Sequence, residues 1–371
     1  MWIADKYIDY VREQTIENPG QSWGKMLIGF QANKLRTKLL PKKEITKGYQ
    51  KLEALMMSFV ADSLCRPDSY VWGNIFSPCE IMQCFGLNTL SIECLACYLS
   101  GYRLEDYFID YAQNTGIAPT LCSYHKTFVG AIDSGAVPAP WYAVTTSLSC
   151  DGNLNTFRYL EKKKGVPFTF LDVPYGDDDA SVNYLAGQLR DFAGELERRF
   201  GKPFDEEKLK ENIRIENETR KELMRFFQLQ SEYYYPGELI SHLYMMMGMH
   251  LLIGTQDFLD LVRFMIKEIQ TYPKFEGKKI LWVHLLPFYQ ESLQHYFNAN
   301  QKYQIIASDI ILDSVEEMDT ERPFHALARK IIHNAYNGSY SHRAELVCGL
   351  ADTLHPDAVI QFCHWGCKQS S

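Results

Sequence analysis

Short apolar runs alternate with amphipathic segments along most of this chain. Seven runs rich in β-branched and aromatic residues predict strands, at residues 70–76, 88–92, 141–147, 166–171, 280–286, 303–306 and 358–362. Segments with apolar residues at helical spacing follow most of these runs. Strands that alternate with helices are typical of parallel sheets joined by crossover helices. The pattern therefore predicts an α/β protein.

Two long stretches contain no predicted strand. The first 69 residues have apolar positions at helical spacing, and residues 176–276 read as a charged and then Met-rich helical stretch that is interrupted at Pro203. We therefore predict four parts. They are an N-terminal helical segment at 1–69, a first α/β domain at 70–175, a helical connector at 176–276 and a second α/β domain at 277–371.

Composition and charge narrow the classes of partner. The chain has 371 residues, of which 46% are hydrophobic and 23% charged, as is usual for a globular protein. Its net charge of −8 argues against a broad nucleic-acid-binding surface. The apolar runs are shorter than the roughly 20 residues that a membrane span needs, and the N-terminus lacks a signal-like apolar core. We expect a cytoplasmic protein that binds neither nucleic acid nor membrane.

The cysteines suggest the chemistry. Ten cysteines are present, and in the cytosol they are expected to be buried thiols, a redox pair or metal ligands rather than disulfides. Four of them lie on apolar helical faces and are predicted to be small core side chains: Cys65, Cys94, Cys97 and Cys348.

Other cysteines lie where predicted strands give way to helices. Cys79 follows the first predicted strand, Cys122 opens a helix, and Cys367 follows the last strand. Cys150 and Cys363 have comparable positions, and both a ligand role and a core role stay open for them. Ligands bind at the carboxyl ends of parallel strands, and a helix N-terminus favours a thiolate. Thiols so far apart in sequence suit an iron–sulfur cluster between two domains, although the ligand type alone also allows zinc.

Four motifs in order resemble the 2-hydroxyacyl-CoA dehydratase family, which includes benzoyl-CoA reductase subunits. They are Asn-Ile-Phe-Ser-Pro-Cys-Glu at 74–80, Leu-Cys-Ser-Tyr-His at 121–125, Ser-Cys-Asp-Gly at 149–152 and His-Trp-Gly-Cys-Lys at 364–368. The resemblance implies two flavodoxin-like domains that hold a [4Fe–4S] cluster between them. Because family members generally continue beyond the last motif, the second domain is expected to be truncated.

Carried over by motif, the ligands implied by the resemblance are Cys79, Cys122 and Cys367. Cys150 and Cys363 are additional candidates, because some relatives hold a larger double-cubane cluster. Glu80, next to Cys79, is the candidate catalytic group for proton transfer. The alternative for Glu80 is a carboxylate that only stabilises the first turn of a helix.

The resemblance implies an iron–sulfur subunit of a 2-hydroxyacyl-CoA dehydratase-like lyase, which removes the 2-hydroxyl of an acyl-CoA by radical chemistry. The implied partners are the acyl-CoA, a second subunit of the same family in a hetero- or homodimer, and an ATP-dependent activator protein, since the chain contains no P-loop. Two other functions stay open. One is a benzoyl-CoA-reductase-like or other small-molecule reductase subunit, and the other is a non-catalytic electron-transfer subunit.

Overall fold

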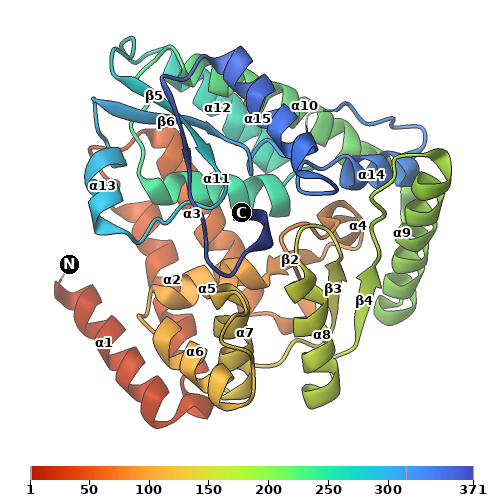
Figure 1. Cartoon of the computed structure of the whole chain (residues 1–371). Coiled ribbons are helices and arrows are strands. Elements are labelled where there is room, and N and C mark those ends of the chain that lie inside the picture. The colour runs from red at the N-terminus through yellow and green to blue at the C-terminus, as the bar shows by residue number, and fades with distance from the viewer. Residues whose placement is uncertain (1, 315, 371) are drawn as a thin grey trace.

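Two parallel β-sheets form the framework of the computed structural model, which describes residues 2–314 and 316–370 (Figure 1). The first sheet has the order β2-β1-β3-β4, with β1 at Tyr70–Gly73, β2 at Asn88–Ser91, β3 at Ala143–Thr146 and β4 at Phe168–Leu171. The second has the order β6-β5-β7, with β5 at Lys278–Val283, β6 at Tyr303–Ser308 and β7 at Ala358–Gln361. All neighbouring strands are parallel. The predicted α/β class is confirmed, whereas the flavodoxin-like description stays a prediction.

Helices surround the first sheet and precede it in the chain. The N-terminal helices are α1 at Trp2–Glu17, α2 at Trp23–Leu39 and α3 at Lys47–Leu64, and α2 packs against α3. The helices between and after the strands of the first sheet are α4 at Cys79–Cys84, α5 at Ile92–Ser100, α6 at Glu105–Asn114, α7 at Ser123–Asp133 and α8 at Asp151–Lys164.

The stretch between the two sheets is helical, as its pattern predicts. Its helices are α9 at Asp179–Phe200, α10 at Glu206–Gln230, α11 at Leu239–Leu251 and α12 at Gln256–Ile269. Gly201, with a φ of 62°, ends α9 in the left-handed conformation that glycine adopts readily, and Pro203 follows it. The second sheet is accompanied by α13 at Glu291–Phe297, α14 at Pro323–Ile332 and α15 at Tyr340–Leu354.

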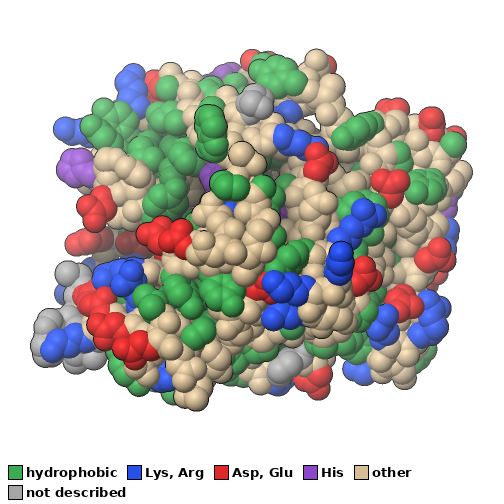
Figure 2. All heavy atoms as spheres, turned by 60° about the horizontal axis from the view of Figure 1, so that its bottom comes forward, with side chains coloured by type: hydrophobic (Ala, Val, Ile, Leu, Met, Phe, Trp, Pro, Cys, Tyr) green, Lys and Arg blue, Asp and Glu red, His purple; other side chains and the backbone are tan. Residues whose placement is uncertain are grey.

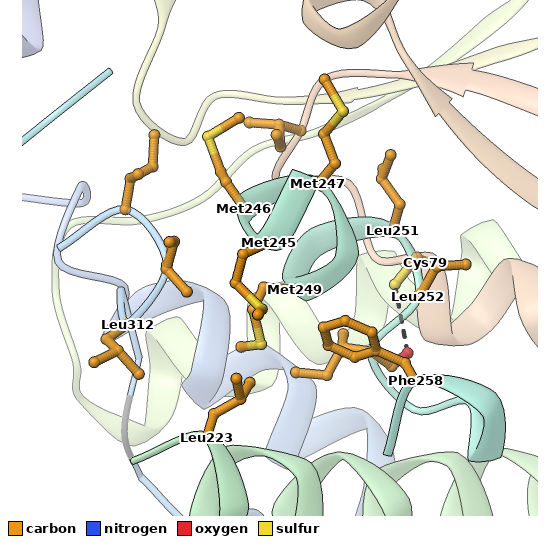
Figure 3. Close-up of a cluster of buried hydrophobic side chains, with 14 of the residues drawn as sticks. Cys79, Leu223, Met245, Met246, Met247, Met249, Leu251, Leu252, Phe258 and Leu312 are labelled. Atoms are coloured by element: carbon orange, nitrogen blue, oxygen red, sulfur yellow. Dashed lines mark hydrogen bonds between the residues drawn. The ribbon is translucent and has the colours of Figure 1, made fainter. Parts of the chain in front are cut away.

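One hydrophobic core connects the two sheets. The same cluster of buried side chains includes Val71 and Val144 from the first sheet and Leu281 and Ile306 from the second. The Met-rich helix α11 contributes Met245, Met246, Met247 and Met249 to this cluster (Figure 3). Flexible thioether side chains fill irregular gaps well, which suits a helix between two sheets. The boundaries of the four predicted parts stay a prediction.

Two observations concern the surface charge and the apolarity of the helices. On the face shown in Figure 2, basic and acidic side chains are interspersed. Among the described residues, none of the helices has the length and apolarity that crossing a membrane requires.

Two cysteine predictions are wrong. Cys65 and Cys348 were expected in the core, but both are exposed. Cys65 lies just beyond the last residue of α3, where the helix no longer presents an inward face, and Cys348 lies on an outer face of α15. Cys94 is buried and Cys97 is partly buried, as expected.

Candidate functional site

The strand orders mark one position in each sheet where a ligand is expected. Successive strands lie on opposite sides of β1 in the first sheet and of β5 in the second, so the order reverses between β1 and β3 and between β5 and β7. In open α/β sheets, ligands bind beyond the carboxyl ends of the strands at such a reversal. Cys150 follows β3, and Cys367 follows β7. Both cysteines therefore lie beyond the carboxyl end of a strand at which the strand order reverses, where a ligand is expected.

The C-terminal segment brings these two positions together. After β7, it runs from the second sheet toward α5 and α7 and ends near the centre of the view (Figure 1). His364 Nε2 lies 3.2 Å from Ser123 Oγ at the start of α7. Lys368 Nζ donates to both carboxylate oxygens of Asp151 at 2.9 Å, at the start of α8. The segment that carries Cys367 therefore lies against the first turns of two helices of the other sheet.

Three thiols converge there, and we call Cys122, Cys150 and Cys367 the thiol site. Cys122 and Cys150 are the N-cap residues of α7 and α8. The charge of a Cys122 thiolate would be opposed by Cys150 and Cys367, and Cys150 is likewise affected by Cys367. Gly366 permits the approach, since a Cβ atom there would lie 2.9 Å from Cys122 Cα. A side chain at position 366 would push Cys367 away from the other two.

Burial keeps two of these thiols protonated in the absence of a cation. Burial raises the pKa of Cys122 to about 12 and that of Cys150 to about 11, although backbone N–H groups in the first turns of α7 and α8 act in the opposite direction. The helix N-terminus alone is therefore too weak to give the thiolate that the sequence suggested. A thiol that stays protonated is a poor nucleophile, whereas a bound metal would deprotonate it.

A buried ion pair holds the C-terminal segment in place. Asp309, which follows β6, is fully buried and accepts hydrogen bonds from Arg343 Nε at 2.8 Å and from the Tyr336 hydroxyl at 3.1 Å. The Arg343 guanidinium also donates to the carbonyl oxygen of Gln369, two residues after Cys367. Gln369 Nε2 in turn donates to the carbonyl oxygen of Ser149 at 3.3 Å. This network thus connects both sheets at the thiol site.

Glu93 is a partly buried carboxylate of this site that the sequence analysis did not single out. It lies in the first turn of α5, directly beyond β2, and accepts a hydrogen bond from the Ser91 hydroxyl. Burial raises its pKa to about 7, although hydrogen bonds from Ser91 and the backbone lower it. Its charge acts on Cys150. Its position just after a predicted strand could have identified it. The neighbouring Cys94 and Cys97, at helical spacing, indicated an apolar helix face instead.

Cys79 is not part of the thiol site. It is 1% exposed and lies in the Met-rich core, where its Sγ is 4.0 Å from the carbonyl oxygen of Ile253 (Figure 3). Burial raises the pKa of this thiol well above its usual value, and the charged groups that act on it are Glu80, Lys330, Glu216 and Arg220. The five residues between β1 and α4 turn the start of α4 into the core. The structure therefore brings together Cys122 and Cys367 of the predicted set, but not Cys79.

Glu80 and Cys363 also lie away from the three thiols. Glu80 is 1% exposed and forms an ion pair with Lys330, whose Nζ is also 3.1 Å from Glu216 Oε1. This arrangement ties α4 to α10 and α14. Cys363 is exposed on the outer side of the C-terminal segment. Neither position matches a direct role in the thiol site.

A large cavity of about 1260 Å³ adjoins the thiol site. One side of the cavity lies close to Cys122. This side is lined by Cys97, Ser123, Tyr124 and His364. Most of the remaining wall is apolar or aromatic, and it includes the side chains of Phe30, Met57, Tyr98, Tyr102, Tyr244 and Phe288. Ligand pockets typically combine such a wall with a few polar groups at one end.

The donor set of the thiol site consists of soft sulfur ligands. Among residues 2–314 and 316–370, no group of three or more His, Cys, Asp and Glu side chains is arranged to hold one metal ion. A four-iron cluster spaces its thiolate ligands more widely than a single ion does. Cys122, Cys150 and Cys367 are partly buried soft donors with cationic groups nearby at Arg343 and Lys368, and thiolates are the ligands that iron–sulfur clusters use.

The fold and the site define an α/β protein with two parallel sheets, a shared core, and a partly buried set of thiols beside an apolar cavity. Residues 74–371 match the family described as 2-hydroxyglutaryl-CoA dehydratase, D-component, and the chain belongs to this family. The resemblance found in the sequence is therefore confirmed.

Two relatives of this chain match it at low sequence identity. The chain is 23% identical over 157 residues to the (R)-2-hydroxyisocaproyl-CoA dehydratase alpha subunit of Clostridioides difficile, which covers 40% of this chain and 38% of the relative. It is 20% identical over 267 residues to the (R)-phenyllactyl-CoA dehydratase alpha subunit of Clostridium sporogenes, which covers 65% of each chain. The matched region thus spans less than two thirds of either relative.

Proposed function

We propose that this chain is an iron–sulfur subunit of a 2-hydroxyacyl-CoA dehydratase-like enzyme, in which Cys122, Cys150 and Cys367 hold a [4Fe–4S] cluster. The observation that carries the proposal is the convergence of three thiols from the two sheets beside an apolar cavity. The family and the names of its relatives support the dehydratase class. Compared with the ligands implied by sequence motifs, Cys150 takes the place of Cys79.

The residues around the thiol site have separable tasks. When bound, a four-iron cluster with three protein ligands supplies one-electron chemistry and one iron without a protein ligand. The aromatic wall of the cavity would bind and orient the acyl group and exclude water from it. Glu93, held nearly neutral by burial, would deliver a proton to the departing hydroxyl group. Ser123 and His364 lie between cavity and thiols, where they can hydrogen-bond a polar part of the substrate.

The same proposal includes partners. Both relatives are named as alpha subunits, which supports a second subunit of the same family. An ATP-dependent activator would supply the electron from outside. Trp365 is 96% exposed and Cys363 is exposed, and both lie on the C-terminal segment next to Cys367.

Iron and acid-labile sulfide analysis of anaerobically purified protein tests the ligand set. We expect about four irons per chain in the wild type, loss of most of the iron in Cys150→Ala, and full iron in Cys79→Ala. Replacing Cys79 removes only a small buried side chain, so we expect a stability loss of about 1 kcal/mol. Full iron in Cys150→Ala together with iron loss in Cys79→Ala would restore the motif-based ligand set.

An activity assay separates the dehydratase from the alternatives. With partner subunit and activator present, a dehydratase-like enzyme releases water from a 2-hydroxyacyl-CoA and forms the unsaturated thioester. Reduction of an aromatic thioester without loss of water would identify a reductase instead.

A further inference from the structure

His284 occupies a strained position at the carboxyl end of β5, the central strand of the second sheet. It is the first residue after β5, and its φ of 74° is in the left-handed region that residues other than glycine rarely adopt. Its backbone N–H donates to Asp309 Oδ1 at 2.7 Å, which fixes the turn. Ser149, next to Cys150, has a similar φ of 73°. Strained residues that the surroundings hold in place are frequent at functional sites.

The imidazole of His284 is buried without a hydrogen-bond partner. The residue is 3% exposed, and among the described residues neither Nδ1 nor Nε2 has a partner. A buried donor or acceptor that stays unpaired costs about 1–3 kcal/mol, so native proteins usually pair such groups. Burial and the nearby charges of Arg343 and His364 lower the pKa of the ring to about 3. The ring is therefore neutral and presents one N–H donor and one acceptor.

The surroundings of His284 belong to the thiol site. β5 and β7 are parallel neighbours, so His284 and the segment that carries Cys367 both begin at the carboxyl ends of these strands. Phe362 N donates to Val283 O at 3.1 Å, which holds the two chain segments together there. The Tyr336 ring, which lies 6.2 Å from the His284 ring, contacts Arg343. Arg343 holds Gln369 and acts electrostatically on Cys367.

We propose that His284 is a further residue of this site and donates an N–H hydrogen bond to the cluster held by Cys122, Cys150 and Cys367. The inference rests on the proposed function. It accounts for a buried imidazole that has no partner within the protein, located at the strand reversal where a ligand is expected. Hydrogen bonds to cluster sulfur favour the more negative reduced state, so this contact raises the reduction potential.

The test compares two His284 variants with a matched control in anaerobically prepared full-length protein. His284→Leu removes the donor, and His284→Gln retains an N–H donor. His242→Leu is the control and replaces a buried histidine of α11 that packs against Tyr49. We expect a lower reduction potential in His284→Leu with unchanged iron content, a smaller shift in His284→Gln and none in His242→Leu. Because His284→Leu could fail to fold, pulsed electron paramagnetic resonance of the reduced wild type gives an independent readout. It should detect weak coupling to an imidazole nitrogen, and the coupling parameters should change to those of an amide nitrogen in His284→Gln.

The outcomes separate the inference from the proposed function. A wild-type chain that binds no iron and sulfide would overturn both. A chain that binds the cluster, but whose potential in His284→Leu equals that of the wild type, would overturn only the role of His284. Strong nitrogen coupling, typical of direct coordination, would also overturn it, because the ring would then be a ligand.

Discussion

Glu93 and Glu80 are two carboxyl groups whose neighbours give them different roles. Burial raises the pKa of both to about 7. Glu80 is paired with Lys330 and lies beside Glu216, which Lys330 and Arg220 keep ionised. Glu93 accepts hydrogen bonds from the Ser91 hydroxyl and from backbone groups, His250 acts on it electrostatically, and its own charge acts on Cys150. A proton on Glu93 is therefore available to the thiol site, whereas Glu80 is part of a structural ion network.

Replacing Glu93 by Gln should abolish proton delivery without removing the cluster. We expect turnover to fall at least about 100-fold, as for the loss of a general acid, with unchanged iron content. In the wild type, activity should fall as the pH rises through about 7, because Glu93 loses the proton that it must donate. The pH profile of turnover and iron analysis check this. The matched variant Glu80→Gln should retain the wild-type limb near pH 7, and a limb that persists in Glu93→Gln would contradict the assignment.

At the scale of elements, the segment after β7 depends on α15 and β6 for its position. It contains only a short 3₁₀ turn at Lys368–Ser370, so its own backbone hydrogen bonds do not determine where Cys367 lies. Arg343 on α15 and Asp309 after β6 supply this positioning. A buried ion pair is costly to break because it leaves one unpaired charge.

Replacing Arg343 by Met should loosen this segment. Asp309 would lose its charged partner, so we expect a loss of about 3–5 kcal/mol in the free energy of unfolding. In metal-free protein, Cys367 should react faster with a thiol reagent, as measured by mass spectrometry of the labelled peptide. Arg263→Met is the control, because Arg263 pairs with Glu218 on the surface. Equal labelling rates of Cys367 in the Arg343 and Arg263 variants would show that the ion pair does not position the segment.

At the scale of the whole molecule, a shared core and a buried ion network join the two sheets. Lys330 on α14 contacts Glu80 on α4 and Glu216 on α10. It therefore links the second half of the chain to the first sheet and to the connector. Because the hydrophobic core is also continuous, we expect the two sheets to unfold together.

Removing Lys330 should destabilise the protein in a pH-dependent way. Lys330→Met leaves Glu80 without its cation, whereas Glu216 keeps Arg220, and we expect a loss of about 3–5 kcal/mol near pH 7. Lys330 lowers the pKa of both Glu80 and Glu216, so its removal raises both. The folded variant then binds protons more tightly than the unfolded chain, and its stability falls as the pH rises above about 4.5. Denaturant unfolding at pH 5 and pH 8 measures this difference.

The surface variant Lys274→Met provides the comparison for Lys330→Met. Lys274 pairs with Glu232, and both side chains are more than half exposed. We expect this variant to lose little stability, with little dependence on pH, because an exposed ion pair contributes little to stability. A similar small loss in Lys330→Met at both pH values would show that the buried network contributes little.

Local patterns along the chain are enough to predict the elements and the family. All seven predicted strands are present, because apolar runs and turn residues are local signals. Tertiary structure decided which thiols meet. Cys79 and Cys150 both follow a strand, but α4 carries Cys79 into the core while the loop after β3 leaves Cys150 at the sheet edge. Convergence at that edge depends on strand order, on the path of the C-terminal segment and on the space at Gly366, which are properties of the folded chain rather than of any short stretch of it.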